Sequence, residues 1–337
     1  MTNPVLEINH VRTSFKINDD YYAAVDDVSL TLNKNEVLAI VGESGCGKSA
    51  LAFSIMGLHR QAKIEGNIMF KGQDLATISN ATFNKLRGHQ IGMIFQDPLT
   101  ALNPLMRIGD QIGEVILLHQ KSINKQARKQ KVLNLLNEVG ITNPQRTYEQ
   151  YPHELSGGMR QRVIIAIAIA NEPEVLIADE PTTALDATIQ SQILQLMNKL
   201  KNDMEAGIIL ITHDLGVVAE MADRVAVMYA GQIVEMTDIE TLFENPLHPY
   251  TKSLLHSIPS NVKPKSKLHV IQGIVPSLKN LPRTGCRFKA RIPWVPESEH
   301  EANPVLHEVA TGHFVRCTCY KNFNLHGLKE DGAHVLS

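Results

Sequence analysis

A glycine-rich loop near the start of the chain contains the residues best suited to chemistry. The order of its residue types matches G-x-x-x-x-G-K-[ST], a pattern that wraps the phosphates of a nucleotide. An apolar run over 37–41 precedes the loop and a helical pattern follows it, which is the strand–loop–helix context that such a site requires. The loop consists of Gly42, Glu43, Ser44, Gly45, Cys46, Gly47, Lys48 and Ser49, and Ala50 continues into the helix.

Each part of this loop has a predicted role. The backbone N–H groups of 44–49 are expected to converge on phosphate oxygens, because glycine permits a close approach and unusual dihedral angles. Lys48 supplies a positive charge to the β- and γ-phosphates, and the hydroxyl of Ser49 is predicted to bind Mg²⁺. An accidental glycine-rich turn would not explain the flanking strand and helix, so the segment 42–50 indicates a nucleotide-binding site.

Two adjacent carboxylates, Asp179 and Glu180, follow an apolar strand pattern over 175–178. Side chains alternate along a strand, so the two point in different directions. Asp179 suits Mg²⁺, directly or through a water molecule. Glu180 is suited to activate the attacking water, either as a general base or as the group that polarises it. A solvated strand end before Pro181 is the alternative, and a phosphate loop in the same chain favours the hydrolytic interpretation.

Polar residues also end two other predicted strands. His213 follows the apolar run 208–212, and Gln96 follows the run 91–95. Ligands of open α/β sheets bind at the carboxyl ends of strands, which makes both residues candidates for the site. His213 is predicted to hydrogen-bond the γ-phosphate and the attacking water, with a purely structural role as the alternative. Gln96 is predicted to reach Mg²⁺ or water through its amide.

A second motif for handling phosphate begins at Leu155. Ser156 is a favoured N-cap residue, and the glycines that follow expose backbone N–H groups at the positive end of a helical run over 159–170. A helix start of this kind is an anion site. One nucleotide needs only one phosphate loop, so the second motif requires an explanation. Its residues are Leu155, Ser156, Gly157, Gly158, Met159, Arg160 and Gln161.

The elements that must position these residues alternate between strands and helices. Patterns typical of buried strands cover 175–178 and 208–212, a helix is predicted between them, and a hairpin pattern follows over 225–235. Continuous apolar strands separated by helices indicate a mostly parallel sheet that is covered on both faces. The predicted fold class is therefore α/β.

Two changes of pattern divide the chain. A mainly helical stretch predicts a helical subdomain over about 97–160, inserted between two strands of the sheet. From about Met236 prolines and histidines become frequent and the periodicity weakens. We therefore expect a nucleotide-binding domain over 1–235 and a C-terminal extension over 236–337.

Composition narrows the class of protein. The chain has 337 residues and a formal net charge of -2, which gives no electrostatic case for binding nucleic acid. Its start lacks the apolar core of a signal peptide. The most apolar stretch, 163–170, is far shorter than the roughly 20 residues that a membrane span needs. The expectation is a cytosolic chain that contacts a membrane only through a partner.

Together, these motifs resemble the nucleotide-binding subunit of ABC transporters, a P-loop NTPase fold. In that family the segment from Leu155 to Gln161 is the signature motif, which closes on the γ-phosphate held by a partner subunit. The resemblance therefore explains the second motif. It implies that two ATP molecules, with Mg²⁺, lie between two ATPase subunits, and that the inserted helices receive a transmembrane partner.

The resemblance also implies roles for individual residues. Gln96 is similar to the Q-loop glutamine, Asp179 and Glu180 to the Walker B pair, and His213 to the switch histidine. The D-loop corresponds to Ala184-Leu185-Asp186. Phe15 falls where the family places the aromatic residue that stacks on adenine, and Tyr22 remains an alternative.

The C-terminal extension resembles that of the oligopeptide and dipeptide importer branch. The resemblance rests on the segments 243–255, 273–278 and 281–288. It implies that ATP hydrolysis drives import of short peptides. It further implies two transmembrane permeases, a second homologous ATPase, an extracytoplasmic peptide-binding protein and a position on the cytoplasmic face of the cell membrane.

Other substrates and one other class of protein remain as alternatives. Dipeptide, nickel and antimicrobial-peptide transporters share this extension, so the sequence separates them poorly. A soluble ABC ATPase of translation or DNA repair would act on nucleic acid without a membrane. Such chains carry tandem ATPase units or a long coiled-coil insertion, whereas this chain resembles one unit with a short helical insertion.

The cysteines of the extension depart from the resemblance. Many relatives carry four cysteines there and bind an iron–sulfur cluster, but this extension has only Cys286, Cys317 and Cys319, and Ile292 stands where another would fall. A [4Fe–4S] cluster takes four thiolates, so none is expected. A Cys₃His zinc site that uses His300, His307 or His313 stays open. Three structural thiols in a reducing cytosol are the expected state.

Overall fold

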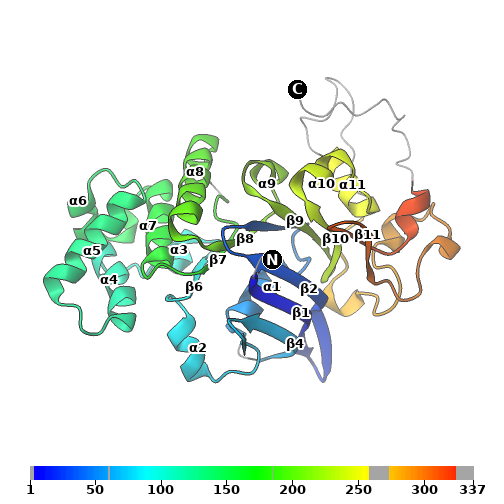
Figure 1. The fold of residues 1–337 in the computed structure, drawn as a ribbon, viewed down its shortest axis with the longest axis horizontal. Helices are drawn as coiled ribbons and strands as arrows, with labels where there is room; N and C mark the ends of the chain where they lie inside the picture. Colours follow the sequence, from blue (N-terminus) through cyan, green and yellow to red (C-terminus); the bar gives the residue numbers. More distant parts are fainter. Residues whose placement is uncertain (1–3, 60, 184, 258–272, 324–337) are drawn as a thin grey trace.

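The protein is built on two sheets that share one core. The computed structural model describes residues 4–59, 61–183, 185–257 and 273–323 (Figure 1). The main sheet has eight strands and the second sheet has four. No helix in these described ranges combines the length and the apolar character that crossing a membrane requires.

Five neighbouring strands, from β9 to the edge strand β6, make up the parallel part of the main sheet, as the alternating pattern predicts. Their order is β9-β3-β8-β7-β6, and antiparallel strands β10, β12 and β11 continue the sheet beyond β9. The bounds are β3 (Val37–Val41), β6 (Ile91–Ile94), β7 (Val175–Asp179), β8 (Gly207–Thr212), β9 (Arg224–Tyr229), β10 (Gln232–Asp238), β11 (Leu306–Ala310) and β12 (His313–Arg316).

The second sheet is antiparallel and comes mainly from the N-terminal region. Its order is β2-β1-β4-β5, with bounds β1 (Pro4–Ile17), β2 (Asp20–Asn33), β4 (Ala62–Phe70) and β5 (Gln73–Asp74). The turn between β1 and β2 lies at Asn18 and Asp19, and Asn18 has a positive φ of 58°. Asparagine tolerates this conformation better than most residues, which suits it to the turn.

Helices cover both faces of the main sheet (Figure 1). On one face α1 and the second sheet share a core with Ile177, Ile209 and other strand residues, and on the opposite face α7 and α8 pack on their neighbours Ala178 and Leu210. The helices are α1 (Lys48–Ile55), α2 (Asn80–Leu86), α3 (Pro98–Ala101), α4 (Ile108–His119), α5 (Lys125–Glu138), α6 (Pro144–Glu149), α7 (Gly157–Ile169), α8 (Ala187–Met204), α9 (Leu215–Met221), α10 (Ile239–Glu244) and α11 (Pro249–His256).

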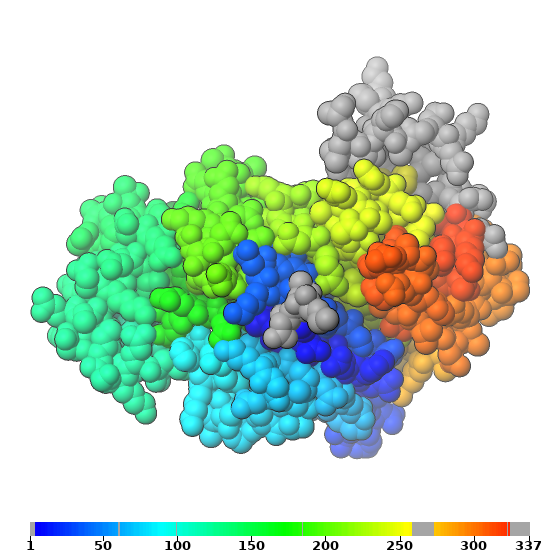
Figure 2. Space-filling view, viewed as in Figure 1, coloured from blue at the N-terminus to red at the C-terminus, as the bar shows by residue number. Residues whose placement is uncertain are grey.

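The inserted helices and the C-terminal extension lie at opposite ends of the molecule (Figures 1 and 2). Helices α4, α5 and α6 form one end with the apolar side chains of Ile112 and Leu136 in their core. At the other end β12 pairs with β10, so the extension continues the main sheet. The sequence pattern did not predict β11 or β12, because each is short and β12 becomes a strand through its pairing with β10.

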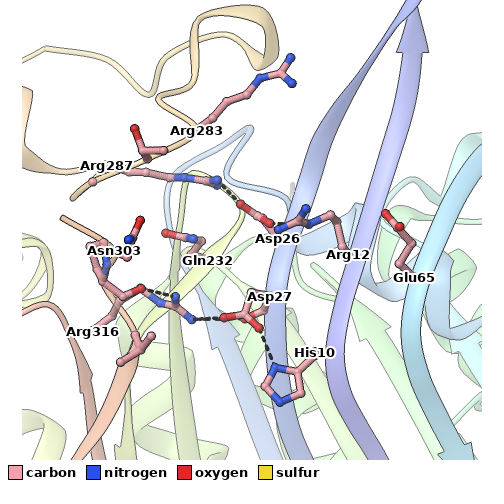
Figure 3. Close-up of a pocket in the computed structure, with 14 residues that line it drawn as sticks. His10, Arg12, Asp26, Asp27, Glu65, Gln232, Arg283, Arg287, Asn303 and Arg316 are labelled. Atoms are coloured by element: carbon pink, nitrogen blue, oxygen red, sulfur yellow. Dashed lines mark hydrogen bonds and ion pairs between the residues drawn. The ribbon is translucent and has the colours of Figure 1, made fainter. Parts of the chain in front are cut away.

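Buried ion pairs join the extension to the second sheet (Figure 3). Arg287 pairs with Asp26, and Arg316 lies 3.6 Å from the carboxylate of Asp27. Both arginines are at most 8% exposed. These groups line a cavity of about 390 Å³ that also contains Arg12, whose guanidinium lies 2.7 Å from Asp26. Ion pairs across this cavity join Arg287 and Arg316 of the extension to Asp26 and Asp27 of β2, and so help to fix the extension.

Candidate functional site

The candidate site lies where neighbouring parallel strands of the main sheet end. Strands β3, β8, β7 and β6 are adjacent, and their last residues are almost level in the register: Val41 faces Thr212, Asp179 faces Ile211, and Ile94 faces Ala178. The phosphate loop, His213, Glu180 and Gln96 follow these four strands. The strand order therefore brings polar residues from distant parts of the chain to one edge of the sheet.

The glycines of the phosphate loop are required by close backbone contacts. Gly47 has a φ of 107°, and a Cβ atom there would lie 2.4 Å from the carbonyl oxygen of Ala24. A Cβ atom at Gly42 would lie 2.1 Å from the carbonyl oxygen of Met228. Neither distance is tolerable for a side chain. Ser44 and Gly45, in contrast, are exposed, so the middle of the loop faces solvent.

The charged and hydroxyl groups at the end of the loop point into the candidate site. Lys48 is 5% exposed, and its ammonium group donates to the carbonyl oxygens of Gly42 (2.7 Å) and Glu43 (3.0 Å). The hydroxyl of Ser49 donates to Asp179 Oδ1 over 3.2 Å. Cys46 is buried beneath the loop, and burial raises the pKa of its thiol. Lysine, serine and aspartate therefore converge from two strand ends.

Two residues of the extension hold the phosphate loop from outside. The backbone N–H of Glu43 donates to the hydroxyl oxygen of Tyr250 over 2.8 Å. The guanidinium of Arg291 forms two hydrogen bonds to the Glu43 carboxylate, at 2.6 and 3.2 Å. Sequence reasoning assigned neither residue to the site. Both residues lie in a region of weak periodicity, and the local pattern does not reveal that Glu43 is their partner.

Asp179 is almost fully buried at the end of β7, with 2% of its surface exposed. Burial raises the pKa of its carboxyl, and the neighbouring charge of Glu180 adds to this effect, whereas Ser49 and Lys48 oppose it. The Ser49 hydroxyl and the Asp179 carboxylate are hard oxygen ligands only 3.2 Å apart. Oxygen ligands of this kind fit Mg²⁺, which also favours the ionised carboxylate.

Glu180 connects the predicted catalytic residues. Its Oε2 atom accepts hydrogen bonds from the amide of Gln96 (2.9 Å) and the hydroxyl of Thr183 (2.8 Å). Its Oε1 atom lies 3.1 Å from His213 Nδ1. The backbone of Glu180 has a positive φ of 48° and donates its N–H to Ile211, so β8 holds it in this uncommon conformation. The three residues predicted to be catalytic thus lie together.

The surroundings of Glu180 favour its ionised form. Burial raises its pKa, but hydrogen bonds from Thr183 and His213, together with the charges of His213 and Lys48, lower it, and the net shift is downward. A carboxylate that stays ionised at neutral pH can orient a water molecule and accept its proton. Sequence reasoning missed Thr183, although a hydroxyl three residues after a candidate base is a signal that could have identified it.

Replacing Thr183 by valine should move the acid limb of the ATPase pH profile to higher pH. The valine keeps the shape but removes a donor to Glu180, so the lowered pKa of Glu180 rises. Activity is lost as pH falls through this pKa, and a higher pKa therefore moves the loss to higher pH. The test is kcat/KM against pH, with Thr188→Val, which changes an exposed threonine on α8, as the control. An unchanged acid limb would contradict the assigned role of Thr183.

Phe15 lies on β1 next to the helix that follows the phosphate loop. Its ring meets that of His59 edge-to-face, with centroids 5.0 Å apart, and His59 in turn contacts Phe53 on α1 at 5.8 Å. Phe15 is half-buried, so part of its ring remains accessible. The alternative, Tyr22, lies opposite Phe15 in the sheet and stacks with the guanidinium of Arg283 at 4.9 Å. Phe15 remains the predicted adenine contact.

The second phosphate motif forms the start of α7, as predicted. Ser156 is the N-cap, and its hydroxyl oxygen accepts from the N–H of Met159 over 3.3 Å. Ser156 and Gly157 are exposed, while Leu155 and Gln161 are buried. A Cβ atom at Gly158 would lie 2.8 Å from the side chain of Ile189 on α8. The open end of α7 thus faces solvent, and its described hydrogen bonds stay within its own segment.

The predicted D-loop lies between Glu180 and α8. Asp186 is the N-cap of α8, and its carboxylate accepts from the N–H of Ile189 over 3.0 Å. Leu185 approaches Gly157, with 4.0 Å between the leucine methyl group and a Cβ atom built on the glycine. Ala184, the first residue of the predicted D-loop, lies outside the described residues. Asp186 therefore orders the helix next to the second motif.

Two family models match the chain. Residues 25–183 match "ABC transporter", and residues 234–295 match "Oligopeptide/dipeptide transporter, C-terminal region". The oligopeptide transport ATP-binding protein OppD of Lactococcus lactis subsp. cremoris (strain SK11) is 50% identical over 331 residues, covering 97% of this chain and 98% of that protein. The dipeptide transport ATP-binding protein DppD of Bacillus subtilis (strain 168) is 51% identical over 292 residues, covering 86% and 87%.

Solved structures of ATP-binding cassettes share the fold. The dimeric cassette MJ0796, solved in a post-hydrolysis state with ADP and phosphate, matches with a TM-score of 0.63 and 27% identity. The match covers 69% of this chain and 98% of that chain. CbiO1 from Clostridium perfringens, part of a transporter complex, matches with a TM-score of 0.61, 26% identity and coverage of 72% and 92%. The chain belongs to the ABC transporter ATP-binding proteins of the oligopeptide and dipeptide branch, which couple ATP hydrolysis to transport.

Proposed function

We propose that this chain is an ATPase subunit that powers the import of oligopeptides through partner permeases. The observation that carries this proposal is the convergence of Gln96, Thr183 and His213 on the Glu180 carboxylate, beside the phosphate loop. The relatives named as oligopeptide transport proteins and the match of the extension support the substrate class. We keep the division into residues 1–235 and 236–337 as part of the proposal.

In this proposal the site residues act on the γ-phosphate of ATP. Residues 42–50 bind the phosphates, Lys48 turns from the loop carbonyls toward them, and Phe15 stacks on the adenine. Ser49 and Asp179, with Gln96, would hold Mg²⁺, which neutralises the phosphate charges. Glu180 orients the attacking water and takes its proton as the new oxygen–phosphorus bond forms and ADP leaves. His213 holds the same water or the γ-phosphate by hydrogen bonding.

The proposed working unit contains two ATPase subunits. The open start of α7, with Leu155, Ser156, Gly157, Gly158 and Gln161, would close on the ATP held by the partner's phosphate loop, and Asp186 would lie at the same interface. The solved dimer of a similar cassette supports this pairing. We propose a second homologous ATPase as the partner, which gives a heterodimer with two ATP molecules at its interface.

Exposed apolar side chains in and just before the inserted helical region suit a permease. Leu105 is 85% exposed and Leu118 on α4 is 63% exposed, while Leu117 and Phe95 are partly exposed. Leu117 and Leu118 are neighbours on α4, and large apolar groups that are exposed together mark interaction surfaces. We therefore propose that one of the two permeases docks here and holds the chain at the cytoplasmic face of the membrane, while an extracytoplasmic binding protein delivers the peptide.

Dipeptide import is the second candidate function. The dipeptide transport protein of Bacillus subtilis is 51% identical over a shorter match, so identity alone does not separate the two substrate classes. No comparable observation favours nickel, antimicrobial peptides, translation or DNA repair. The net charge of -2 also argues against a nucleic-acid partner.

Reconstitution of the complete transporter in proteoliposomes tests this proposal. The chain would be assembled with both permeases, the partner ATPase and the binding protein, and uptake of labelled oligopeptides, dipeptides and nickel measured with ATP on the side of the ATPases. We expect ATP-dependent uptake of oligopeptides. Uptake restricted to dipeptides would favour the second candidate, and peptide-independent ATP hydrolysis without uptake would refute both.

A further inference from the structure

Four potential metal ligands lie together in the extension, away from the phosphate loop. The ligand atoms of Cys286, His300, Cys317 and Cys319 all lie within 4.8 Å of one another. They come from three separate stretches of chain: one before the 3-10 turn Lys289–Arg291, one after the turn Glu297–Glu299, and one after β12. All three cysteines are at most 8% exposed and unpaired by any disulfide. None of these residues takes part in the proposed hydrolysis.

The histidine in this cluster has no other role among the described residues. Both ring nitrogens of His300 are buried, and neither has a hydrogen-bond partner in the part of the chain that the structure describes. The two histidines that the sequence left as alternatives are engaged elsewhere: His307 lies 2.8 Å from Glu301, and His313 lies 2.8 Å from the buried Glu235. Burying an imidazole without a hydrogen-bond partner costs free energy of folding. His300 is therefore a candidate to bind a metal ion together with the three thiols.

The spacing of the ligand atoms fits one ion and does not fit a cluster. Tetrahedral zinc, with Zn–S near 2.3 Å and Zn–N near 2.0–2.1 Å, places its ligand atoms about 3.5 to 3.8 Å apart. The ligand atoms of the four residues lie at most 4.8 Å apart, so they need to move only slightly to reach this geometry. A [4Fe–4S] cluster takes four thiolates on four different irons, whereas this group has three thiols and holds them close together. Ile292 is buried in the adjoining apolar core and offers no ligand.

We propose that Cys286, His300, Cys317 and Cys319 form a closed, mononuclear zinc site. Three thiolates and one imidazole are a common ligand set for structural zinc, and four protein ligands leave no open position for catalysis. This proposal replaces the expectation of three structural thiols and goes beyond the proposed transport function.

Zinc at this position would cross-link a described part of the chain that has little regular secondary structure. Between 273 and 323 the structure contains two short strands and several 3-10 turns, so few backbone ladders stabilise it. The ion would tie the turn that carries Arg291 to the end of β12. Because Arg291 binds Glu43 of the phosphate loop, this cross-link would also keep the loop's outer support in place. The expected role is structural.

Metal analysis of the full chain, purified without oxygen and without a metal-binding tag, tests the proposal. We expect about one zinc per chain, negligible iron and no inorganic sulfide. Cobalt loaded in place of zinc should show the intense absorption of a tetrahedral thiolate site. Iron and sulfide in roughly equal amounts would overturn the mononuclear assignment. A metal-free chain whose thiols all react under native conditions would overturn the site itself.

Variants identify the ligands independently of ATPase activity. Cys317→Ser and His300→Ala should lose most of the zinc, whereas His300→Cys should retain it, because four thiolates also bind zinc tetrahedrally. His307→Ala is the matched control and should keep a full complement. If Cys317→Ser does not fold, the zinc content of the unaltered chain and its loss with a fall in Tm on chelation still decide the matter. Full zinc in His300→Ala would refute the ligand assignment.

Discussion

Glu180→Gln should bind ATP as well as the unaltered chain does and hydrolyse it about 10²- to 10⁴-fold more slowly. Glutamine has the same size and can still accept the hydrogen bonds from Thr183 and Gln96 that hold position 180. It cannot take a proton from water at neutral pH. The phosphate loop is untouched, so binding and hydrolysis should separate cleanly in this variant.

The measurement compares the Kd for ATP with the steady-state rate of phosphate release by the assembled transporter. Glu220→Gln, which changes an exposed carboxylate on α9, is the matched control and should keep the parent rate. A Glu180→Gln variant that hydrolysed ATP at the parent rate would remove Glu180 from its proposed role. A variant that lost ATP binding would instead show that Glu180 shapes the phosphate site.

The second large effect is expected at Ser156, and it should appear only in the assembled pair of ATPases. Aspartate at this position still caps α7, because its carboxylate can accept from Met159 as the serine hydroxyl does. The new negative charge would face the γ-phosphate of the partner's ATP. At a separation near 4 Å and an effective dielectric constant near 20, this repulsion is about 4 kcal/mol, or roughly a thousandfold.

Ser156→Asn is the matched control, since asparagine caps the helix equally well and carries no charge. We expect Ser156→Asp to leave the Tm and the ATP affinity of the isolated chain unchanged, while stimulation of ATPase activity by the partner subunit disappears. Ser156→Asn should retain much of that stimulation. Equal loss in both variants would indicate a steric or capping effect, and no loss in either would place the start of α7 outside the shared site.

The C-terminal extension helps to hold the nucleotide site. Tyr250 and Arg291 contact Glu43 from outside the phosphate loop, and burial strongly raises the pKa of the Tyr250 hydroxyl, which keeps it neutral. The region that resembles peptide transporters is therefore in direct contact with the ATP-binding loop. The proposed zinc site lies in the same segment as Arg291. Loss of the zinc should therefore also disturb the phosphate loop, which Arg291 contacts through Glu43.

Local patterns determined a large part of this protein. The strand, glycine loop and helix around Lys48 are contiguous in the chain, so the phosphate site could be recognised from neighbouring residues alone. The N-cap at Ser156 and the polar residues that end the buried strands are also local signals. For the same reason the α/β class and the positions of the main strands agreed with the sequence-based expectation.

Only the tertiary structure decided which of these local features meet. The order β3-β8-β7-β6 places Gln96, Glu180 and His213 at one edge, although more than a hundred residues separate the first from the last. Pairing between strands depends on long-range packing, which leaves no periodic trace in the sequence. The contact of Arg291 with Glu43 and the grouping of His300 with three cysteines arise in the same way. Each depends on how a region with weak local patterns folds, so neighbouring residues in the sequence do not reveal the partner.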